Sequence, residues 1–263
     1  MRNFYVPSAP APFDQAHGLR RLFAGQRQRF LPLAANPHVA FSGVVLERLT
    51  ATLVAAGQRV LVVDAADSSP LAHELTEIDL VLAVEVLSPQ VSYLAGRGLP
   101  LAYVDTRGSA GGLLDALAMA APEAGVVLLH AEATHLARLF MHREARPLLI
   151  GADQPESIKH AYAACKLLAR RCNLMTFDLL LAAEPGGRRL PTIAASLASC
   201  ADGFLGALLH DWAVIDPASD PAEDPSADLT RLMKAQLALT EDKAAPVWRH
   251  ATTPPRAPSP SPL

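Results

Sequence analysis

Cysteine and aromatic residues are scarce in this sequence of 263 residues, which has 3 cysteines and an aromatic fraction of 5%. Cys165, Cys172 and Cys200 have no C-x-x-C spacing and cannot all pair, so we expect reduced, mostly buried thiols. The sequence also lacks an uncharged apolar run of the roughly 18 residues that a membrane-spanning helix needs. Residues 1–13 lack the apolar centre of a secretory signal. These absences predict a soluble protein of the cytoplasm.

Charge is low overall but unevenly distributed. The formal net charge of −3 argues against general binding to nucleic acid. Residues 1–30 contain five arginines and a single acid, Asp14, whereas residues 211–228 contain six acids and no Lys or Arg. This asymmetry fits a basic arm that meets an acidic partner surface, and it equally fits an arm that docks on its own acidic loop.

From residue 30 onward, apolar strand-like runs alternate with helix-like segments. Strands are predicted at 29–35, 58–66, 99–105, 124–131, 146–152, 174–183 and 206–216. Helices are predicted at 44–56, 111–121, 133–143, 155–172 and 190–205, while 75–87 is ambiguous. Continuous apolar strands separated by helices of this length are typical of an α/β fold with a mainly parallel, doubly wound sheet covered on both faces.

The two ends of the sequence differ from this central part. Prolines at 7, 10 and 12 keep the first residues extended, and a short helix follows between an N-cap at Asp14 and a stop at Gly25. The composition after residue 240 is rich in proline and predicts disorder. We therefore expect a mobile arm over 1–29, one α/β domain over 30–240 and a disordered tail over 241–263.

Two stretches of the central part resemble the MinD-type P-loop family. In "LTATLVAAGQR" followed by "VLVVDAAD", a helix closed by Gly-Gln-Arg precedes a strand that ends at Asp64. The segment "DQPESIKHAYAACKLLARR" is similar to the family's P-x-S-I-x-x-A-Y-x-x-x-K helix, with matches at Pro155, Ser157, Ile158, Ala161, Tyr162 and Lys166. The resemblance implies a MinD-like fold over 30–240.

The arm carries a motif of one branch of that family. The sequence "DQAHGLR" matches the D-Q-A-x-x-L-R motif of the flagellar regulators FlhG, also called FleN, at Asp14, Gln15, Ala16, Leu19 and Arg20. In FlhG proteins this helix docks on FlhF, a GTPase related to those of the signal-recognition particle, and stimulates GTP hydrolysis. The alternative interpretation is a helix that packs on its own domain through Leu19, Leu22 and Phe23.

The phosphate-binding loop of the family is where the sequence departs from it. The family's loop reads K-G-G-x-G-K followed by Ser or Thr, because glycine N–H groups wrap the phosphates, lysine neutralises them and the hydroxyl binds Mg²⁺. The corresponding stretch here is "PHVAFSG", which puts Pro37 and Ser42 at the lysine positions and Gly43 at the hydroxyl position. His130 stands where an aspartate is expected, and Asp64 remains, although such a carboxylate is also typical of a helix cap.

These departures predict a protein that is not an enzyme and needs no cofactor or metal. We expect a pseudo-ATPase without a nucleotide-driven dimer, which acts as a constitutive activator of an FlhF-like GTPase and so influences flagellar number or placement. The resemblance further implies contacts with other flagellar or transcriptional regulators, recruitment to the cell pole through the partner, and no more than indirect membrane association. Two alternatives remain open: a MinD-type positioning ATPase with a non-standard loop, and a scaffold unrelated to flagella.

Three weaker signals are interpreted as structural. His130 and His135 are separated by five positions rather than the four of the H-E-x-x-H zinc motif. The glycine-rich stretch 108–112 is typical of a turn before a helix. The segment 227–239 has an apolar stripe of the kind that binds membranes in MinD proteins, but it lacks large aromatic residues, so we expect a last core helix.

Overall fold

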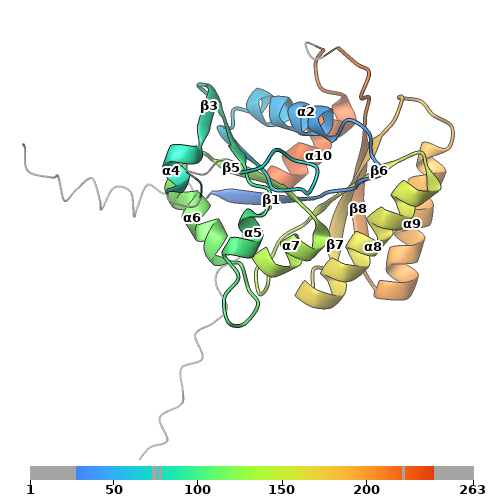
Figure 1. Cartoon of the computed structure of the whole chain (residues 1–263). Coiled ribbons are helices and arrows are strands. Elements are labelled where there is room, and N and C mark those ends of the chain that lie inside the picture. Colours follow the sequence, from blue (N-terminus) through green and yellow to red (C-terminus); the bar gives the residue numbers. More distant parts are fainter. Residues whose placement is uncertain (1–27, 73–75, 77–78, 221–222, 240–263) are drawn as a thin grey trace, which may run out of the picture.

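The chain forms one eight-stranded sheet in the computed structural model, which describes residues 28–72, 76, 79–220 and 223–239 (Figure 1). The strands are β1 (Arg29–Ala34), β2 (Val60–Asp64), β3 (Glu85–Ser88), β4 (Val91–Ala95), β5 (Val126–Ala131), β6 (Leu148–Ala152), β7 (Thr176–Ala182) and β8 (Leu208–Ile215). Their order across the sheet is β3-β4-β2-β5-β1-β6-β7-β8, and every neighbouring pair is parallel except β3 and β4. The predicted, mainly parallel sheet is thereby confirmed.

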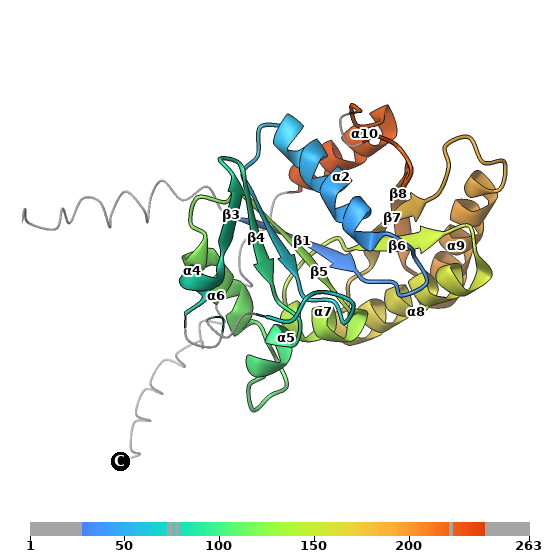
Figure 2. The ribbon, with the colours of Figure 1, turned by 45° about the horizontal axis from the view of Figure 1, so that its top comes forward.

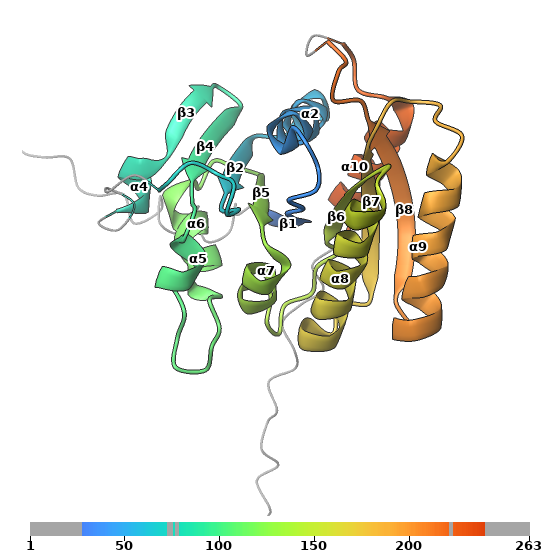
Figure 3. The same ribbon diagram turned by 45° about the vertical axis from the view of Figure 1, so that its right-hand side comes forward.

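Helices cover both faces of the sheet. They are α2 (Ser42–Ala55), α4 (Leu80–Ala83), α5 (Leu99–Ala102), α6 (Gly112–Ala120), α7 (Ala133–Leu139), α8 (Pro155–Cys172), α9 (Leu190–Leu205) and α10 (Ala227–Leu237). Helices α2 and α10 lie side by side and enclose one apolar core with the sheet (Figure 2). Helices α4 to α9 enclose the larger core on the opposite face (Figure 3). The result is a three-layer α/β/α arrangement.

The sequence explains why the central elements form. All six residues of β5 are buried, because a strand in the middle of a parallel sheet is covered on both faces and needs apolar residues at every position. Helix α2 buries Val45, Leu49 and Leu53, which recur at the four-residue spacing of one helix face. Helix α8 has Pro155 in its first turn and ends at Asn173, whose φ of 56° is left-handed.

One predicted strand is wrong. Residues 99–105 were expected as a strand, but Leu99–Ala102 is a short helix that begins directly after Gly98, whose φ is 83°. Pro100 lies in the first turn of this helix, where its missing N–H costs no hydrogen bond, whereas a central strand would lose one. The strand that does form is β4, which we did not predict, because Ser92 and Tyr93 interrupt its apolar pattern.

The ambiguous stretch 75–87 divides into a helix and an edge strand. Asp79 caps α4 by accepting a hydrogen bond from the backbone N–H of Val81 at 2.9 Å. Strand β3 then pairs with β4 in the antiparallel hairpin at one edge of the sheet. All four residues of β3 are exposed, which explains why burial periodicity could not identify it.

The predicted last helix forms, whereas most of the two ends of the chain lies outside the described residues. Helix α10 buries Leu229, Leu232 and Met233 against the core, as expected for a core helix. Within the described part of the chain, no helix is both long and apolar enough to cross a bilayer. Nearly all of the predicted arm over 1–29 and the whole predicted tail over 241–263, together with the D-Q-A-x-x-L-R motif, lie outside the described residues.

Candidate functional site

The candidate site lies where β1, β2 and β5 end side by side. The strand register places His130 of β5 opposite Asp64 of β2 on one side and opposite Leu33 of β1 on the other. In open parallel sheets, ligands bind outside the carboxyl ends of the strands, where loops leave for the helices. The loop between β1 and α2, residues 35–41, therefore occupies the position of a phosphate-binding loop.

Asn36 anchors this loop to the neighbouring strand and helix. Its side chain is 4% exposed, and its Nδ2 donates to the carbonyl oxygen of Ile150 at 2.7 Å and to that of Ser157 at 2.9 Å. Its Oδ1 accepts from the backbone N–H of His38 at 3.1 Å. The Ser157 hydroxyl lies 3.1 Å from Nδ2 and accepts from the N–H of Ala152 at 2.9 Å, so that β1, β6 and α8 are joined through one buried amide.

The three residues predicted at the phosphate-loop positions, Pro37, Ser42 and Gly43, follow Asn36 in the chain and are at least partly exposed. Pro37 is exposed, Ser42 is half-buried at the start of α2, and a Cβ placed on Gly43 would meet no atom within 4 Å. Phe41, at the N-cap of α2, has a left-handed φ of 61° and a side chain that is 70% exposed. No side chain caps the helix, and a bulky aromatic ring stands where a P-loop has a glycine.

Asp64 and His130 form the polar centre of the site. His130 Nδ1 lies 2.7 Å from Asp64 Oδ1, and the Ser69 hydroxyl donates to the same oxygen. Burial opposes ionisation of Asp64, but the hydrogen bonds from His130 and Ser69, with the charge of His130, hold its pKa below the usual value. The carboxylate is therefore ionised at neutral pH and already engaged by two side chains.

His130 is buried more deeply than its partner. Its side chain is 2% exposed, and its Nε2 has no hydrogen-bond partner among the described residues. Nearby, Glu132 accepts from the backbone N–H of Asp67 at 2.8 Å and lies 3.5 Å from His135 Nδ1. In the described part of the chain, no three His, Cys, Asp or Glu side chains are grouped as a metal site would require.

All five residues that the sequence singled out therefore lie near the carboxyl ends of the central strands: Pro37, Ser42 and Gly43 follow β1, and Asp64 and His130 lie at the ends of β2 and β5. Sequence reasoning missed Asn36 and Ser69, and it identified Ser157 only as part of the family's helix motif. A polar residue directly after an apolar strand, as Asn36 is after β1, was the available signal. The predicted contact residues Asp14, Gln15, Ala16, Leu19 and Arg20 lie outside the described residues.

Comparisons with known proteins identify the fold. No protein-family model matches the chain, and no curated protein sequence matches it either. Among solved structures, it is similar to a putative plasmid partition protein of Borrelia burgdorferi bound to AMPPNP, at 11% identity and a TM-score of 0.56, over 80% of this chain and 98% of that one. It is also similar to cobyrinic acid a,c-diamide synthase of Mycobacterium smegmatis, at 17% identity and a TM-score of 0.52, over 80% and 94%.

A third structure is the MinD cell division protein of Aquifex aeolicus, at 10% identity and a TM-score of 0.50, over 79% of this chain and 97% of that one. Identities this low establish the fold alone. The chain has the α/β fold of the MinD cell division protein and of the plasmid partition protein.

Proposed function

We propose that the chain is an ATP-independent regulator of the FlhG type, which binds an FlhF-like GTPase through residues 14–20 and stimulates its GTP hydrolysis. One observation carries the proposal: a full match to the D-Q-A-x-x-L-R motif stands directly ahead of a MinD/ParA fold. Such activity would influence flagellar number or placement, with recruitment to the pole through the partner.

The chemistry of the motif suits GTPase activation. Phosphoryl transfer requires an oriented water and neutralisation of the spreading negative charge, and glutamine commonly orients the water. In the helix that the sequence predicts, Gln15 stands in the first turn, while Leu19 and Leu22 follow at i+4 and i+7 on the same face. This face presents one polar tip above two apolar anchors, and Arg20 lies beside them.

The loop between β1 and α2 supports the loss of ATP chemistry. A P-loop binds phosphate through backbone N–H groups that converge on the ligand. Here the N–H of His38 donates to Asn36 Oδ1 at 3.1 Å, and the N–H of Val39 donates to the Asn36 carbonyl oxygen at 3.1 Å. These donors are already used within the loop, and residues 37–43 contain no lysine to neutralise a triphosphate.

The pairing of His130 with Asp64 supports the same conclusion. A P-loop ATPase uses carboxylates in this region to hold Mg²⁺ and to position water. Asp64 Oδ1 is instead bonded to both His130 and Ser69, so this oxygen is already engaged by protein donors. The fold is then a scaffold that carries the arm.

The test is GTP turnover by the cognate FlhF with the full-length chain, compared with Gln15→Ala. Gln26→Ala, which changes a glutamine of the same arm outside the motif, is the matched control. We expect stimulation by the wild type and the control and its loss in Gln15→Ala. If the full-length chain leaves the turnover rate unchanged, the proposal is wrong.

Calorimetry with Mg-ATP independently tests the proposal that the chain does not bind ATP. We expect no binding at micromolar nucleotide and no change in oligomeric state. Micromolar binding with formation of a dimer would instead support a MinD-type positioning ATPase with a non-standard loop.

A further inference from the structure

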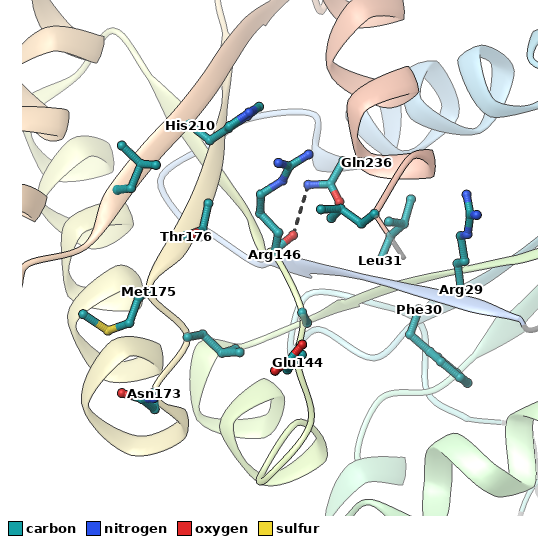
Figure 4. A pocket seen from close by; sticks show the side chains of 14 residues that line it. Arg29, Phe30, Leu31, Glu144, Arg146, Asn173, Met175, Thr176, His210 and Gln236 are labelled. Carbon is teal, nitrogen blue, oxygen red and sulfur yellow. Dashed lines mark hydrogen bonds between the residues drawn. The ribbon is translucent and has the colours of Figure 1, made fainter. Parts of the chain in front are cut away.

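A hollow lies at the other end of the strands, where their amino ends meet (Figure 4). Its volume of about 550 Å³ falls within the range of small-ligand sites. The apolar part of its lining includes Leu31 of β1, Leu208 of β8 and Leu239, and the polar part includes Arg146 and Gln236. The candidate site described above lies at the carboxyl ends of the same strands, so the length of the strands separates it from the hollow.

A buried polar cluster stands behind the lining. Asp178 of β7 is fully buried, and its Oδ2 lies 3.0 Å from Arg146 Nε. Gln236 Nε2 donates to the same oxygen at 2.8 Å and to the Arg146 carbonyl oxygen at 3.0 Å (Figure 4 shows the latter bond). Asp178 Oδ1 is held by His210 Nδ1 at 3.2 Å and by the N–H of Asp211 at 3.1 Å. The charge of Asp178 is therefore compensated, and both its oxygens are occupied.

Two atoms of this cluster remain unused. Arg146 Nη2 is a donor, and Gln236 Oε1 is an acceptor, without a hydrogen-bond partner among the described residues. The Arg146 side chain is 7% exposed and Gln236 is 1% exposed, and an unmet polar group at such depth destabilises the fold. Both side chains line the hollow and lie next to each other (Figure 4).

A neighbouring donor and acceptor define the chemistry of the ligand. A carboxylate or phosphate offers only acceptors, so it would satisfy Arg146 but place a negative charge against Gln236 Oε1 and near Asp178. A neutral group with both a carbonyl oxygen and an N–H matches the pair. Peptide groups and the indole of tryptophan supply these functions, and the leucine lining suits an apolar ring.

We propose that the hollow is the docking site of the chain's own C-terminal segment, residues 240–263, with Trp248 as the inserted side chain. The indole N–H donates to Gln236 Oε1, a backbone carbonyl beside Trp248 accepts from Arg146 Nη2, and the ring packs between Leu31, Leu208 and Leu239.

We choose residues 240–263 as the occupant of the hollow because of their position in the chain. Leu239, the last described residue, itself lines the hollow, and 240–263 continues from it. Trp248 is the only Phe, Trp or Tyr in that segment. Trp248 lies nine positions beyond Leu239, and nine extended residues reach roughly 30 Å, which is enough to return to the hollow. A short tether also gives a millimolar effective concentration, so that a weak contact suffices. The proposal does not rest on the GTPase role.

Tryptophan fluorescence tests it in the full-length chain. Trp212→Phe removes the only other tryptophan and leaves Trp248 as the reporter. We expect the emission maximum of this variant to be blue-shifted relative to that of a synthetic peptide of residues 240–263. We also expect acrylamide to quench the variant severalfold more weakly than the peptide. Adding Leu208→Glu, at a side chain that is 57% exposed and so tolerant of charge, should abolish both effects. Phe204→Glu, on the exposed face of α9 at 76%, is the matched control and should retain them.

Hydrogen exchange of the unaltered chain gives a second, independent measurement. Amides near Trp248 should be protected, and Leu208→Glu should remove that protection. Emission and quenching equal to those of the free peptide would overturn the proposal, because the hollow would then hold only water. Protection of residues 1–27 in place of 240–263, lost in Leu208→Glu, would overturn it as well and would assign the hollow to the arm.

Discussion

His130 Nδ1 lies 2.7 Å from Asp64 Oδ1, across the paired ends of β5 and β2. The two side chains stand at the carboxyl ends of neighbouring central strands, and they are bound to each other. Asn36 separately anchors the neighbouring loop between β1 and α2, so both sets of polar contacts lie at the carboxyl ends of the strands, where open parallel sheets bind ligands. These contacts should therefore contribute to the stability of the fold.

The pH dependence of stability should report the Asp64 contact. A carboxyl whose folded pKa lies below the unfolded value, here 3.8, stabilises the fold fully above that value and loses the contribution as the pH falls through the folded pKa. We expect urea unfolding of Asp64→Asn to show a smaller loss of unfolding free energy between pH 6 and pH 3 than the wild type. Asp67→Asn, at an exposed acid on the same loop, should follow the wild type.

Asn36 should be among the most sensitive polar residues of the core. Asn36→Ala removes the donor to Ile150 and Ser157 and leaves their buried acceptors unmet, which costs about 1–3 kcal/mol. Thermal or urea unfolding measures the loss. Gln90→Ala, in the exposed turn between β3 and β4, serves as the control and should change the unfolding free energy by less than about 0.5 kcal/mol. Equal stabilities for the two variants would contradict the anchoring role of Asn36.

Asp178 and Arg146 should show the energetics of a buried ion pair. Burial raises the pKa of Asp178, although Arg146, His210 and Gln236 act in the opposite direction. Asp178→Asn leaves Arg146 buried without a compensating charge, and we expect a loss of about 3–5 kcal/mol in unfolding free energy. Glu156→Gln breaks the exposed pair with Lys159 and should cost less than about 0.5 kcal/mol. Similar losses in both variants would show that burial does not set the cost.

Thiol reactivity should separate the three cysteines. Cys200 is exposed on α9, whereas burial raises the pKa of Cys165 to about 12 and also raises that of Cys172. In native buffer at pH 8, we expect a thiol reagent such as Ellman's reagent to modify Cys200 rapidly and Cys165 only after unfolding. Cys200→Ser should remove the rapid phase. Rapid modification that persists in this variant would contradict the burial of Cys165.

The sequence predicted the central elements well because they are long and strongly patterned. The apolar runs of β2, β5 and β7 and the amphipathic spacing of α8 leave few alternatives, and α9 begins and ends where expected. The failures lie at 75–105, where elements of four or five residues follow one another. The pairing of β4 with β2, the pairing of β3 with β4 and the turn at Gly98 fix such short elements, and a local sequence pattern contains none of these.

The sequence could identify only part of the candidate site, and the reason is again that long-range contacts are not encoded in a local pattern. The sequence identified Pro37, Ser42 and Gly43 because they stand at the positions where a phosphate loop has lysines and a hydroxyl. Such a comparison needs only the spacing of residues along the chain. The partners of Asn36 are 114 and 121 positions away in the chain, and those of Gln236 are 90 and 58 positions away. Contacts of that range depend on the crossover topology of the sheet, so they become apparent only in the folded chain.

The arm and the phosphate-loop region of the body should act independently in the GTPase assay. If stimulation depends on Gln15 alone, Asp64→Asn and Gly43→Ala will leave FlhF turnover unchanged, and Mg-ATP will have no effect. Gly43→Ala is structurally tolerable, since its Cβ would meet no atom within 4 Å. Gln15→Ala should lower the stimulated rate on the order of tenfold or more, because the attacking water loses its orienting group. Turnover that rises with Mg-ATP and falls in Gly43→Ala would instead mean that this region still binds nucleotide and controls the arm.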